Sequence, residues 1–550
     1  MLRFPIGCEP MSRATRNRIV RRIFDWMGLA LASSLVATAQ VSVTTYHYDN
    51  YRTGWNQSET TLTVTAVQSS SFGVLGKVAL DDEVDTQPLI VPGVTITAGG
   101  SPGVYTVVYV VTENDSIYAI DSTTGKILLK PNFGPPVTGP LGCGGTANDV
   151  GINSTPVIDL TSNTLYVMIY NQSSSGPAYW LHALDLGSLT DKVPPQLVTA
   201  SHMLTSGTTY TFNAKYQRQR PALLLSNGNV YAGFGSFCDS APAKSRGWIL
   251  GWQTGTLTPL AGNQLMDALA TSPDNFFLSS IWMSGYGLAT DDSGNILFVT
   301  ANSDPSGTTY DGVNNIQESV VKVSQDLTTV LDLFTPSNVA ALDQGDLDFG
   351  SGGVMVLPDQ LGIVPDLAVA AGKQGTMFFM NEDDLGGFST LANNVLGTYS
   401  IGDCWCGESY YVDPMYGPAV VGSGGKAVTL WEVGTSSSPP TLSSVSSSAA
   451  LETTGSGFFT SVSSNGSTSN PIIWAVSRPT VNQTNILLYA FAPDLGGTTL
   501  QQIFKGTAGV WPLRGNNSNL VPVVANGEVF VASYKELVIL GLRKGKGAKD

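Results

Sequence analysis

The sequence predicts an all-β protein built as one β-propeller, with eight four-stranded blades and seven as the fallback count. Three observations predict this fold. Charged residues make up only 13% of the chain, whereas Gly (60) and Pro (30) are plentiful, as suits short strands joined by tight turns. One strand-turn-strand phrase recurs along the chain. Within each copy apolar residues alternate with others and β-branched residues are frequent, which indicates strands rather than helices.

The repeat opens at a Pro or Gly and runs through two apolar strands, a polar loop and a third strand. Its clearest copy lies between Asp85 and Lys126. A blade cannot bury both of its faces alone, so stacking of blades around an axis is expected. The copy that opens at 458 is degenerate, which keeps seven blades as the fallback. The copies open near residues 86, 154, 221, 285, 352, 417, 458 and 520.

The repeats set the expected domain limits. The propeller spans 72–542, and its first strand, 74–80, is expected to complete the last blade, because an open edge strand invites aggregation. An extended segment, 40–71, precedes it, and a basic tail, 543–550, follows. Residues 436–457, rich in Ser and Thr, are expected to form a low-complexity loop inside the ring.

Residues 1–39 have the features of a signal peptide. A basic stretch precedes a short apolar segment, and Ala37-Thr38-Ala39 supplies a small-x-small cleavage pattern, so the mature chain is expected to begin at Gln40. A membrane-anchor helix is the alternative, but the apolar run is short for one. The chain is therefore expected in the periplasm, at the cell surface or outside the cell, with no membrane span after cleavage.

The charge of the mature chain excludes one class of partner. Residues 1–39 carry six arginines and two acidic residues, so their removal lowers the net charge from −15 to −19. A surface this negative repels the phosphate backbone. Nucleic-acid binding is therefore excluded.

Four cysteines remain in the mature chain. Cys143, Cys238, Cys404 and Cys406 are disulfide candidates, because an even number in an exported protein favours disulfides, and four cysteines allow three connectivities. A zinc site is less favoured, because the spacing lacks Cys-x-x-Cys and His is scarce.

Polar and aromatic residues just ahead of each predicted inner strand are expected to face an axial funnel and to bind a small polar ligand. The alternative is that they only join blade loops to one another. Trp405 and Trp511 also fall in predicted loops, where a binding role is more credible than for tryptophans within strands. The ligand-binding candidates are Asp85, Gln87, Asn153, Gln219, Arg220, Trp282, Ser284, Tyr416 and Asn519.

One acidic loop could hold a cation. Asp343, Asp346 and Asp348 precede a Gly-rich stretch and offer oxygen ligands suited to Ca²⁺. Their spacing is not that of an EF-hand, so a solvated acidic loop is the alternative.

The phrase Ser116-Ile117-Tyr118-Ala119-Ile120-Asp121-Ser122-Thr123-Thr124-Gly125 resembles the repeat of pyrroloquinoline-quinone (PQQ) propellers, in which "hxAhDxxTG" closes a blade. Phrases spread over 46–540 are similar to secreted PQQ-like, quinoprotein-dehydrogenase-like proteins typical of acidobacteria. The resemblance implies PQQ on the axis, Ca²⁺ held by Glu, Asn and Asp, an Asp base, and adjacent cysteines in a disulfide. In this chain Trp405 separates Cys404 from Cys406, so the two cysteines are not adjacent. No stretch of the sequence supplies the Ca²⁺ ligands at recognisable positions.

Two functions follow. The favoured one is a non-enzymatic binding or surface-interaction module for a small polar ligand, a glycan or a protein. The alternative is a quinoprotein alcohol or sugar dehydrogenase with PQQ and calcium as cofactors, but a shared fold alone is a weak reason to assign an activity.

Overall fold

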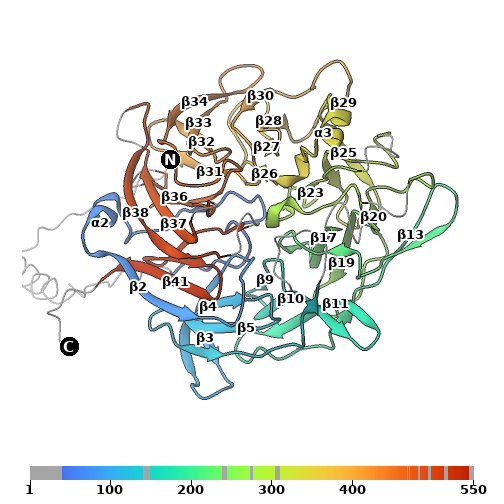
Figure 1. Ribbon diagram of the computed structural model, residues 1–550. Helices are drawn as coiled ribbons and strands as arrows, with labels where there is room; N and C mark the ends of the chain where they lie inside the picture. The colour runs from blue at the N-terminus through green and yellow to red at the C-terminus, as the bar shows by residue number, and fades with distance from the viewer. Residues whose placement is uncertain are drawn as a thin grey trace, which may run out of the picture. The chain divides into compact units, whose positions relative to one another are not determined.

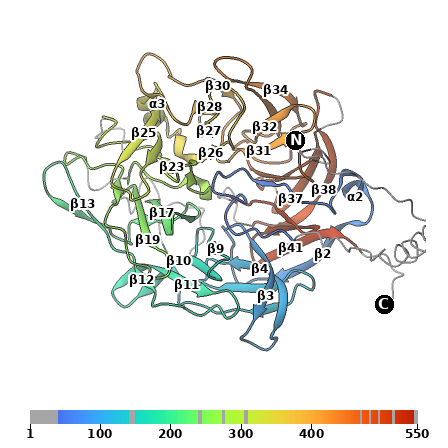
Figure 2. The ribbon, with the colours of Figure 1, turned by 180° about the vertical axis from the view of Figure 1, so that it is seen from behind.

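The computed structural model describes residues 40–543 except 140–148, 238–243, 273–276, 304–309, 468, 470, 481–482, 494–496 and 513–517. The predicted signal peptide, residues 1–39, and nearly all of the basic tail lie outside the described residues. In the unit that begins at Val41, eight antiparallel sheets stand around an axis (Figures 1 and 2). The predicted eight-bladed propeller is confirmed.

The first four blades follow the chain in order. Each sheet runs from its first strand to its fourth by neighbouring antiparallel pairs. They are blade 1, β3 (Leu89–Ile96), β4 (Gly103–Val111), β5 (Ile117–Asp121) and β6 (Ile127–Leu129); blade 2, β9 (Val157–Asp159), β10 (Thr164–Ser173), β11 (Gly176–Asp185) and β12 (Gln196–Leu197); blade 3, β16 (Leu224–Ser226), β17 (Asn229–Ser236), β19 (Trp248–Gln253) and β20 (Gln264–Leu265); and blade 4, β22 (Ala289–Thr290), β23 (Ile296–Val299), β24 (Val320–Val323) and β25 (Val330–Thr335).

The last four blades include the degenerate repeat, which forms a complete blade 7. They are blade 5, β26 (Val354–Val356), β27 (Leu367–Ala371), β28 (Thr376–Asn381) and β30 (Gly397–Ser400); blade 6, β31 (Ser409–Asp413), β32 (Gly417–Gly422), β33 (Thr429–Gly434) and β34 (Thr441–Ser447); blade 7, β35 (Phe459–Ser463), β36 (Ile472–Val476), β37 (Asn485–Ala492) and β38 (Gln501–Val510); and blade 8, β39 (Val523–Ala525), β40 (Glu528–Ala532), β41 (Glu536–Leu542) and β2 (Phe72–Ala79).

Short helices and strands occur in addition to the four main strands of each blade. Among the described residues, no helix is long and apolar enough to span a membrane. The short elements are the helices α2 (Val64–Gln68) and α3 (Val339–Gly345), and the strands β1 (Trp55–Asn56), β7 (Val137–Thr138), β8 (Asp149–Val150), β13 (Ser201–Met203), β14 (Thr209–Thr211), β15 (Gln217–Arg218), β18 (Ser245–Arg246), β21 (Phe277–Leu278) and β29 (Gly387–Phe388).

The ring closes through the first long strand of the chain. β2 pairs antiparallel with β41 from Phe72 to Ala79, so the N-terminal strand is the outer strand of blade 8, as predicted. The hydrophobic core lies between neighbouring blades. One buried cluster joins blades 8 and 1 through Ile90 and Phe530, and another joins blades 7 and 8 through Trp474 and Val531. Stacking therefore buries the apolar faces that single blades expose.

One predicted loop contains a strand. Within residues 436–457, β34 pairs with β33 as the outer strand of blade 6. The prediction of a loop throughout this segment is wrong, because an outer strand is held by main-chain hydrogen bonds on one side and needs few apolar residues. Leu442 and Leu451 supply them, and both are buried.

The segment before the propeller, which the sequence predicts as extended, contacts every blade. Residues 43–56, here called the axial strap, cross the centre of the ring and bond to the first strand of every blade, which places those strands innermost (Figure 1). The bonds are Val43 N to Ile90 O, Ile158 N to Thr44 O, Asn50 Nδ2 to Leu225 O, Thr290 N to Asn50 O, Val356 N to Tyr51 O, Tyr410 N to Thr53 O, Val462 N to Gly54 O and Tyr48 Oη to Val524 O, at 2.7–3.0 Å.

The strap is itself held by buried side chains. The Arg52 guanidinium, fully buried, donates to Leu288 O (2.7 Å), to Thr45 Oγ1 (2.7 Å) and to Tyr46 O (2.8 Å). Farther along, α2 interrupts the segment predicted as extended. Its N-cap, Thr63, accepts a hydrogen bond from Ala66 N (3.2 Å), as Thr commonly does at a helix start.

Candidate axial binding site

Side chains that precede the innermost strands meet across the ring. Arg220, just before blade 3, reaches Asp85 before blade 1, and Arg478 of blade 7 reaches Trp405 before blade 6. Together they form the axial site, which has two parts. The acidic side comprises Glu83, Asp85, Glu113, Asp115, Asn153, Arg218 and Arg220, and the aromatic side comprises Trp282, Lys373, Trp405, Arg478 and Asn519.

The acidic side is a buried network centred on Asn153. Its Nδ2 donates to Asp85 Oδ2 (2.5 Å) and to a Glu113 carboxylate oxygen, while its Oδ1 accepts from Arg218 Nε (2.6 Å). Arg218 and Arg220 also lie 3.8 and 3.7 Å from the Asp85 carboxylate. Two guanidinium groups thus offset part of the negative charge that burial makes costly.

Three carboxyls of this network keep their protons at neutral pH. Burial, reinforced by the charge of Asp85, raises the pKa of Glu83 to about 10 and that of Glu113 to about 8. Burial and the charge of Glu113 raise the pKa of Asp115 to about 9. Both oxygens of Asp115 and one of Glu83 are buried without a hydrogen-bond partner. These groups are therefore mainly neutral acids in the folded protein.

The network brings together one Glu, one Asn and one Asp, the types that the resemblance implies for Ca²⁺, although no sequence run indicated them. Its geometry does not fit that ion. Asn153 turns its amide hydrogens toward the carboxylates of Asp85 and Glu113, and the two guanidiniums flank Asp85. A cation would meet N–H groups where it needs oxygen ligands. Among the residues described, no three of these carboxylates place ligand atoms within 4.8 Å of one another.

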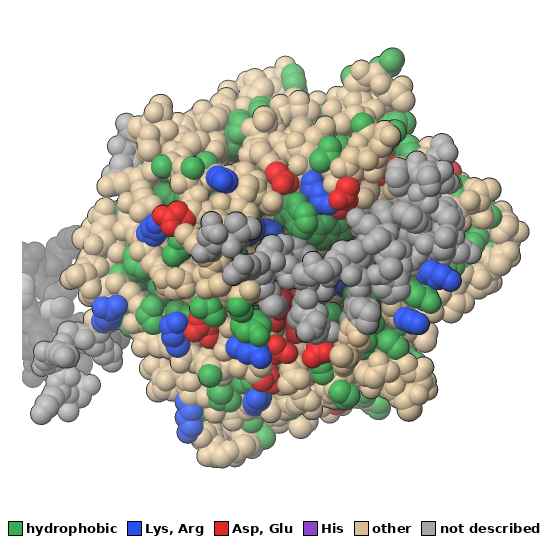
Figure 3. Space-filling view, viewed as in Figure 1, with side chains coloured by type: hydrophobic (Ala, Val, Ile, Leu, Met, Phe, Trp, Pro, Cys, Tyr) green, Lys and Arg blue, Asp and Glu red, His purple; other side chains and the backbone are tan. Residues whose placement is uncertain are grey.

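The aromatic side is built on two tryptophans. The rings of Trp282 and Trp405 meet edge to face, with centroids 5.4 Å apart. The Lys373 ammonium lies 5.0 Å from the centroid of Trp405 and 5.8 Å from that of Trp282. All three side chains are partly exposed, in contrast to the acidic side. Figure 3 shows one face of the ring, on which hydrophobic, basic and acidic side chains adjoin near the middle.

Buried polar groups with unused capacity border these rings. Arg478 donates to Asn519 Oδ1 (2.6 Å) and to the backbone oxygen of Trp405. Within the described structure, Arg478 Nε, Asn519 Nδ2 and Asp403 Oδ1 have no hydrogen-bond partner. Burial lowers the pKa of Arg478 to about 9. Two donors and one acceptor therefore lie unused next to the tryptophans.

The predicted calcium loop does not converge on one point. Asp346 Oδ1 and Asp348 Oδ2 lie 3.2 and 3.0 Å from the Lys373 ammonium. Asp343, at the end of α3, instead accepts hydrogen bonds from Ser303 N (2.9 Å) and from Gln317. It also lines a separate cavity of about 530 Å³ beside α3. Lys373 thus takes the place that a cation would occupy between two of the three carboxylates.

Four other predicted ligand residues have different surroundings. Gln87 holds the strap, with its Nε2 donating to Thr45 O (3.1 Å). Gln219 accepts from Ser154, and Ser284 Oγ donates to Ser351 O (2.5 Å), so both join loops. Tyr416 is misplaced: it lies in the turn between β31 and β32, at the end of blade 6 opposite the axial site.

The misplacement of Tyr416 has a local cause. The apolar phrase from Gly417 was interpreted as the inner strand of blade 6, but it is the second strand, β32. The residues that precede the true inner strand, β31, are 404–408, which contain the two cysteines and Trp405. Trp511, expected in a binding loop, is instead fully buried between blades 7 and 8.

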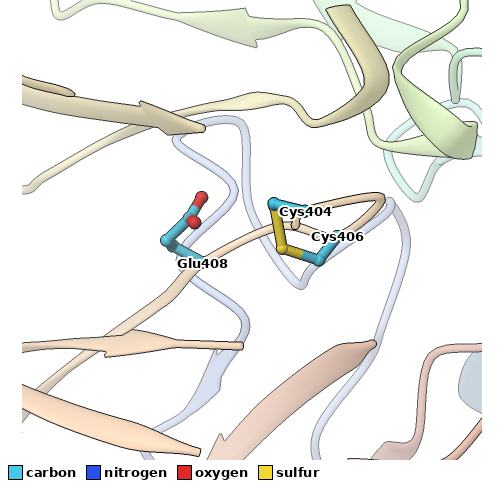
Figure 4. A group of neighbouring side chains, drawn as sticks. All are labelled: Cys404, Cys406 and Glu408. Carbon is cyan, nitrogen blue, oxygen red and sulfur yellow. A yellow bond between two sulfur atoms is a disulfide. The ribbon is translucent and has the colours of Figure 1, made fainter. Parts of the chain in front are cut away.

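One predicted disulfide is present. Cys404 and Cys406 are bonded to each other, with their Cα atoms 4.8 Å apart, and the bridge encloses Trp405 (Figure 4). The prediction of at least one disulfide is confirmed. Cys143 and Cys238 lie outside the described residues.

Sequence reasoning missed Glu83, Glu113, Asp115, Arg218, Lys373 and Arg478. Glu83 lies two residues before a predicted candidate, and Arg218 adjoins two others, so the repeat register could have indicated them. Glu113, Lys373 and Arg478 follow the second strand of blades 1, 5 and 7. Loops after second strands reach the same face as loops before first strands, because the strands alternate in direction.

Eight blades around a closed axis make this chain an eight-bladed β-propeller. Comparison with solved structures shows that its fold is similar to that of quinoprotein dehydrogenases. A quinohemoprotein alcohol dehydrogenase from Comamonas testosteroni matches with a TM-score of 0.60 and 13% identity over 92% of this chain and 82% of that one. A europium-containing methanol dehydrogenase matches with a TM-score of 0.55 and 10% identity over 91% and 98%.

A second quinohemoprotein alcohol dehydrogenase, ADHIIG from Pseudomonas putida HK5, matches with a TM-score of 0.60 and 13% identity, over 92% of this chain and 81% of that one. Neither family models nor curated protein sequences give a match. At such identities the similarity establishes the fold and leaves the activity to be argued from the site.

Proposed function

We propose that this chain is an exported binding module that takes a small polar ligand, such as a sugar ring, at the aromatic side of the axial site. The observation that carries the proposal is the partly exposed Trp282–Trp405 pair beneath Lys373. Tryptophan combines a broad apolar face with a polar edge, which suits a ligand that has one apolar face and several hydroxyls.

The unpartnered groups beside the pair support the same ligand class. A buried donor or acceptor without a partner costs about 1–3 kcal/mol. Arg478 Nε, Asn519 Nδ2 and Asp403 Oδ1 are such atoms. These three atoms are buried, so ligand hydroxyls would donate to the carboxylate and accept from the two nitrogens only after neighbouring side chains move aside. Binding would then recover hydrogen bonds that the folded protein leaves unmade.

Calorimetric titration with a panel of mono- and disaccharides tests this proposal. We expect Trp405→Ala and Trp282→Ala each to weaken binding of any saccharide that the wild type binds by about threefold to tenfold, because contact with an aromatic ring contributes about 0.5–1.5 kcal/mol. Trp431→Ala is the matched control, since Trp431 is also partly exposed but lies in β33, the third strand of blade 6. Equal affinities for all variants, or no binding of any saccharide, would contradict the proposal.

The dehydrogenase alternative makes a different prediction. Thermal unfolding is followed with PQQ and Ca²⁺ together, with each alone and with neither. A native-state ligand at about 100 Kd stabilises by about 2.7 kcal/mol, but we expect no gain, because the Glu113–Asn153–Asp85 group presents N–H donors. A gain that needs both components, with dye-linked oxidation of alcohols or aldoses, would instead establish a dehydrogenase. A gain with Ca²⁺ alone that Asp346→Asn removes would establish calcium binding at the loop of Asp343, Asp346 and Asp348.

Export is part of the proposal. The basic and apolar stretches of residues 1–39 and the site before Gln40 support it. Mass spectrometry of the secreted or periplasmic protein should find Gln40 as its first residue. Recovery of the intact N-terminus in a membrane fraction would contradict it.

A further inference from the structure

The disulfide Cys404–Cys406 lies in the loop that leads into β31, directly behind the aromatic side. Its backbone is tied to neighbouring blades: Cys404 N donates to Gly372 O (3.2 Å), and Trp405 N donates to Ser456 O (2.9 Å). Ser351 Oγ donates to Cys404 O (2.7 Å). Both cysteines are fully buried, whereas Trp405 between them is partly exposed. The bridge therefore fixes a residue of the axial site.

A buried carboxyl stands beside the two sulfur atoms. One carboxylate oxygen of Glu408 and the sulfurs of Cys404 and Cys406 all lie within 4.8 Å of one another (Figure 4). The residue is 1% exposed, and neither carboxylate oxygen has a hydrogen-bond partner on another residue of the described structure; the backbone N–H of Glu408 itself is the group nearest to one. Buried polar atoms are satisfied in most proteins, so a carboxyl with no partner on another residue calls for an explanation.

We propose that Cys404–Cys406 is a thiol–disulfide exchange site for a small dithiol, in which Glu408 protonates the sulfur that leaves. This proposal is independent of the ligand-binding function. A disulfide sulfur departs as a thiolate, and its departure in a buried place is slow unless a proton arrives with it. Glu408 is the one carboxyl that the described structure places within reach of both sulfurs.

The exchange balances as follows. One thiolate of the dithiol attacks a sulfur of the bridge; the Cys404–Cys406 bond breaks, and its electron pair goes to the departing sulfur, which takes the proton of Glu408. The second thiol of the dithiol then displaces the mixed disulfide. The dithiol leaves as a cyclic disulfide, and Glu408 regains a proton from its second thiol. The second cysteine departs as a thiolate and takes from water the proton that the first thiol of the dithiol had released on ionising, so both cysteines end as thiols. The dithiol is oxidised by two electrons and the bridge is reduced by two.

The surroundings of Glu408 favour its acid form. Burial raises its pKa to about 7, so the proton is present below that pH. The titratable group that contacts it is Tyr286, whose hydroxyl donates to Glu408 O (3.1 Å); Tyr46, His47 and Arg52 of the strap in turn contact Tyr286. Burial raises the pKa of both tyrosines, lowers that of His47 to about 3 and lowers that of Arg52 to about 10. Between pH 5 and 9 these four groups therefore keep their charge.

The test is the rate at which dithiothreitol reduces the bridge in the mature protein between pH 5.5 and 8.5. Samples are alkylated and mapped by mass spectrometry, which separates Cys404 and Cys406 from Cys143 and Cys238. Divided by the thiolate fraction of the reagent, the wild-type rate should fall through about pH 7, where Glu408 loses its proton. A profile that stays flat would overturn the proposal without any variant.

Substitutions sharpen the test. Glu408→Gln should slow reduction at pH 6 by about tenfold or more and abolish the pH dependence, whereas Glu408→Asp should retain it. Glu528→Gln is the matched control, because burial also raises the pKa of Glu528 to about 7, but it lies in β40 of blade 8. Its rate and profile should be those of the wild type. If Glu408→Gln reacts at the wild-type rate, or if no reduction of the bridge occurs in the folded protein, the proposal is wrong.

Discussion

The two sides of the axial site differ in burial: charged and polar residues on the acidic side are buried, whereas the tryptophans of the aromatic side are partly exposed. On the acidic side Asp85, Asn153 and Arg220 are buried and bonded to one another. On the aromatic side Trp282 and Trp405 are partly exposed, although both sides hold buried polar atoms without a hydrogen-bond partner in the described structure. The difference teaches that charge near a propeller axis need not indicate a ligand site. The charged side joins the loops of blades 1 to 3, whereas the partly exposed, less charged side is the one at which we propose that a ligand binds.

The acidic side also shows how a strongly acidic chain places carboxyls in a core. Glu83, Glu113 and Asp115 are held as neutral acids, because burial raises their pKa values. Neutral carboxyls need no counter-ion, so two arginines suffice for the network.

The largest expected effect comes from removing one of those arginines. Arg220→Ala should lower the free energy of unfolding by about 3–5 kcal/mol, because the Asp85 carboxylate would lose a buried cation. Urea unfolding measures it. Lys77→Ala, which breaks the surface pair between Lys77 and Glu536 (3.1 Å), should cost about 1 kcal/mol or less. A small effect of Arg220→Ala would contradict the contrast between the two sides, because it would mean that the acidic side does not stabilise the fold.

An effect of similar size should appear as a pH dependence. The pKa of Glu83 rises from 4.5 to about 10 on folding, so between these values the folded state binds the extra proton and its stability falls as pH rises. The slope is at most about 1.4 kcal/mol per pH unit. Glu83→Gln should remove the contribution of Glu83 to this slope. The free energy of unfolding of the variant, measured with urea, should therefore rise relative to that of the wild type from pH 5 to pH 9. Parallel curves would show that Glu83 is ionised in the folded protein; Glu536→Gln, at the surface, is the control.

The smallest effect is expected on the aromatic side. Trp282→Ala should change the free energy of unfolding by about 1 kcal/mol or less, because its side chain is partly exposed and ends in the axial site. Trp474→Ala, in the fully buried core of blade 7, should cost about 3–5 kcal/mol. If the two variants lose equal stability in calorimetric unfolding, both sides of the axial site are structural.

The failures of sequence reasoning occurred where local pattern stopped deciding the structure. In blade 6 the sequence predicts β32 as the inner strand, whereas the inner strand is β31, because the apolar alternation of β32 is as good as that of β31. The Ser-rich β34 carried no apolar pattern at all, since main-chain pairing forms an outer strand. Trp511 sits near a chain turn yet fills the space between two blades. In each case the deciding contacts come from residues distant in the chain.

The sequence by itself predicted the propeller and its closure by the first strand, with eight blades favoured over seven, because turn residues and strand alternation are local signals that recur in most blades. Only the tertiary structure decided which side chains meet on the axis. Arg220 meets Asp85 across 135 residues, and Trp405 meets Arg478 across 73. It also decided that the strap reaches all eight blades and that Glu408 lies unpaired beside a disulfide. These contacts depend on ring closure and blade rotation, which no local segment encodes.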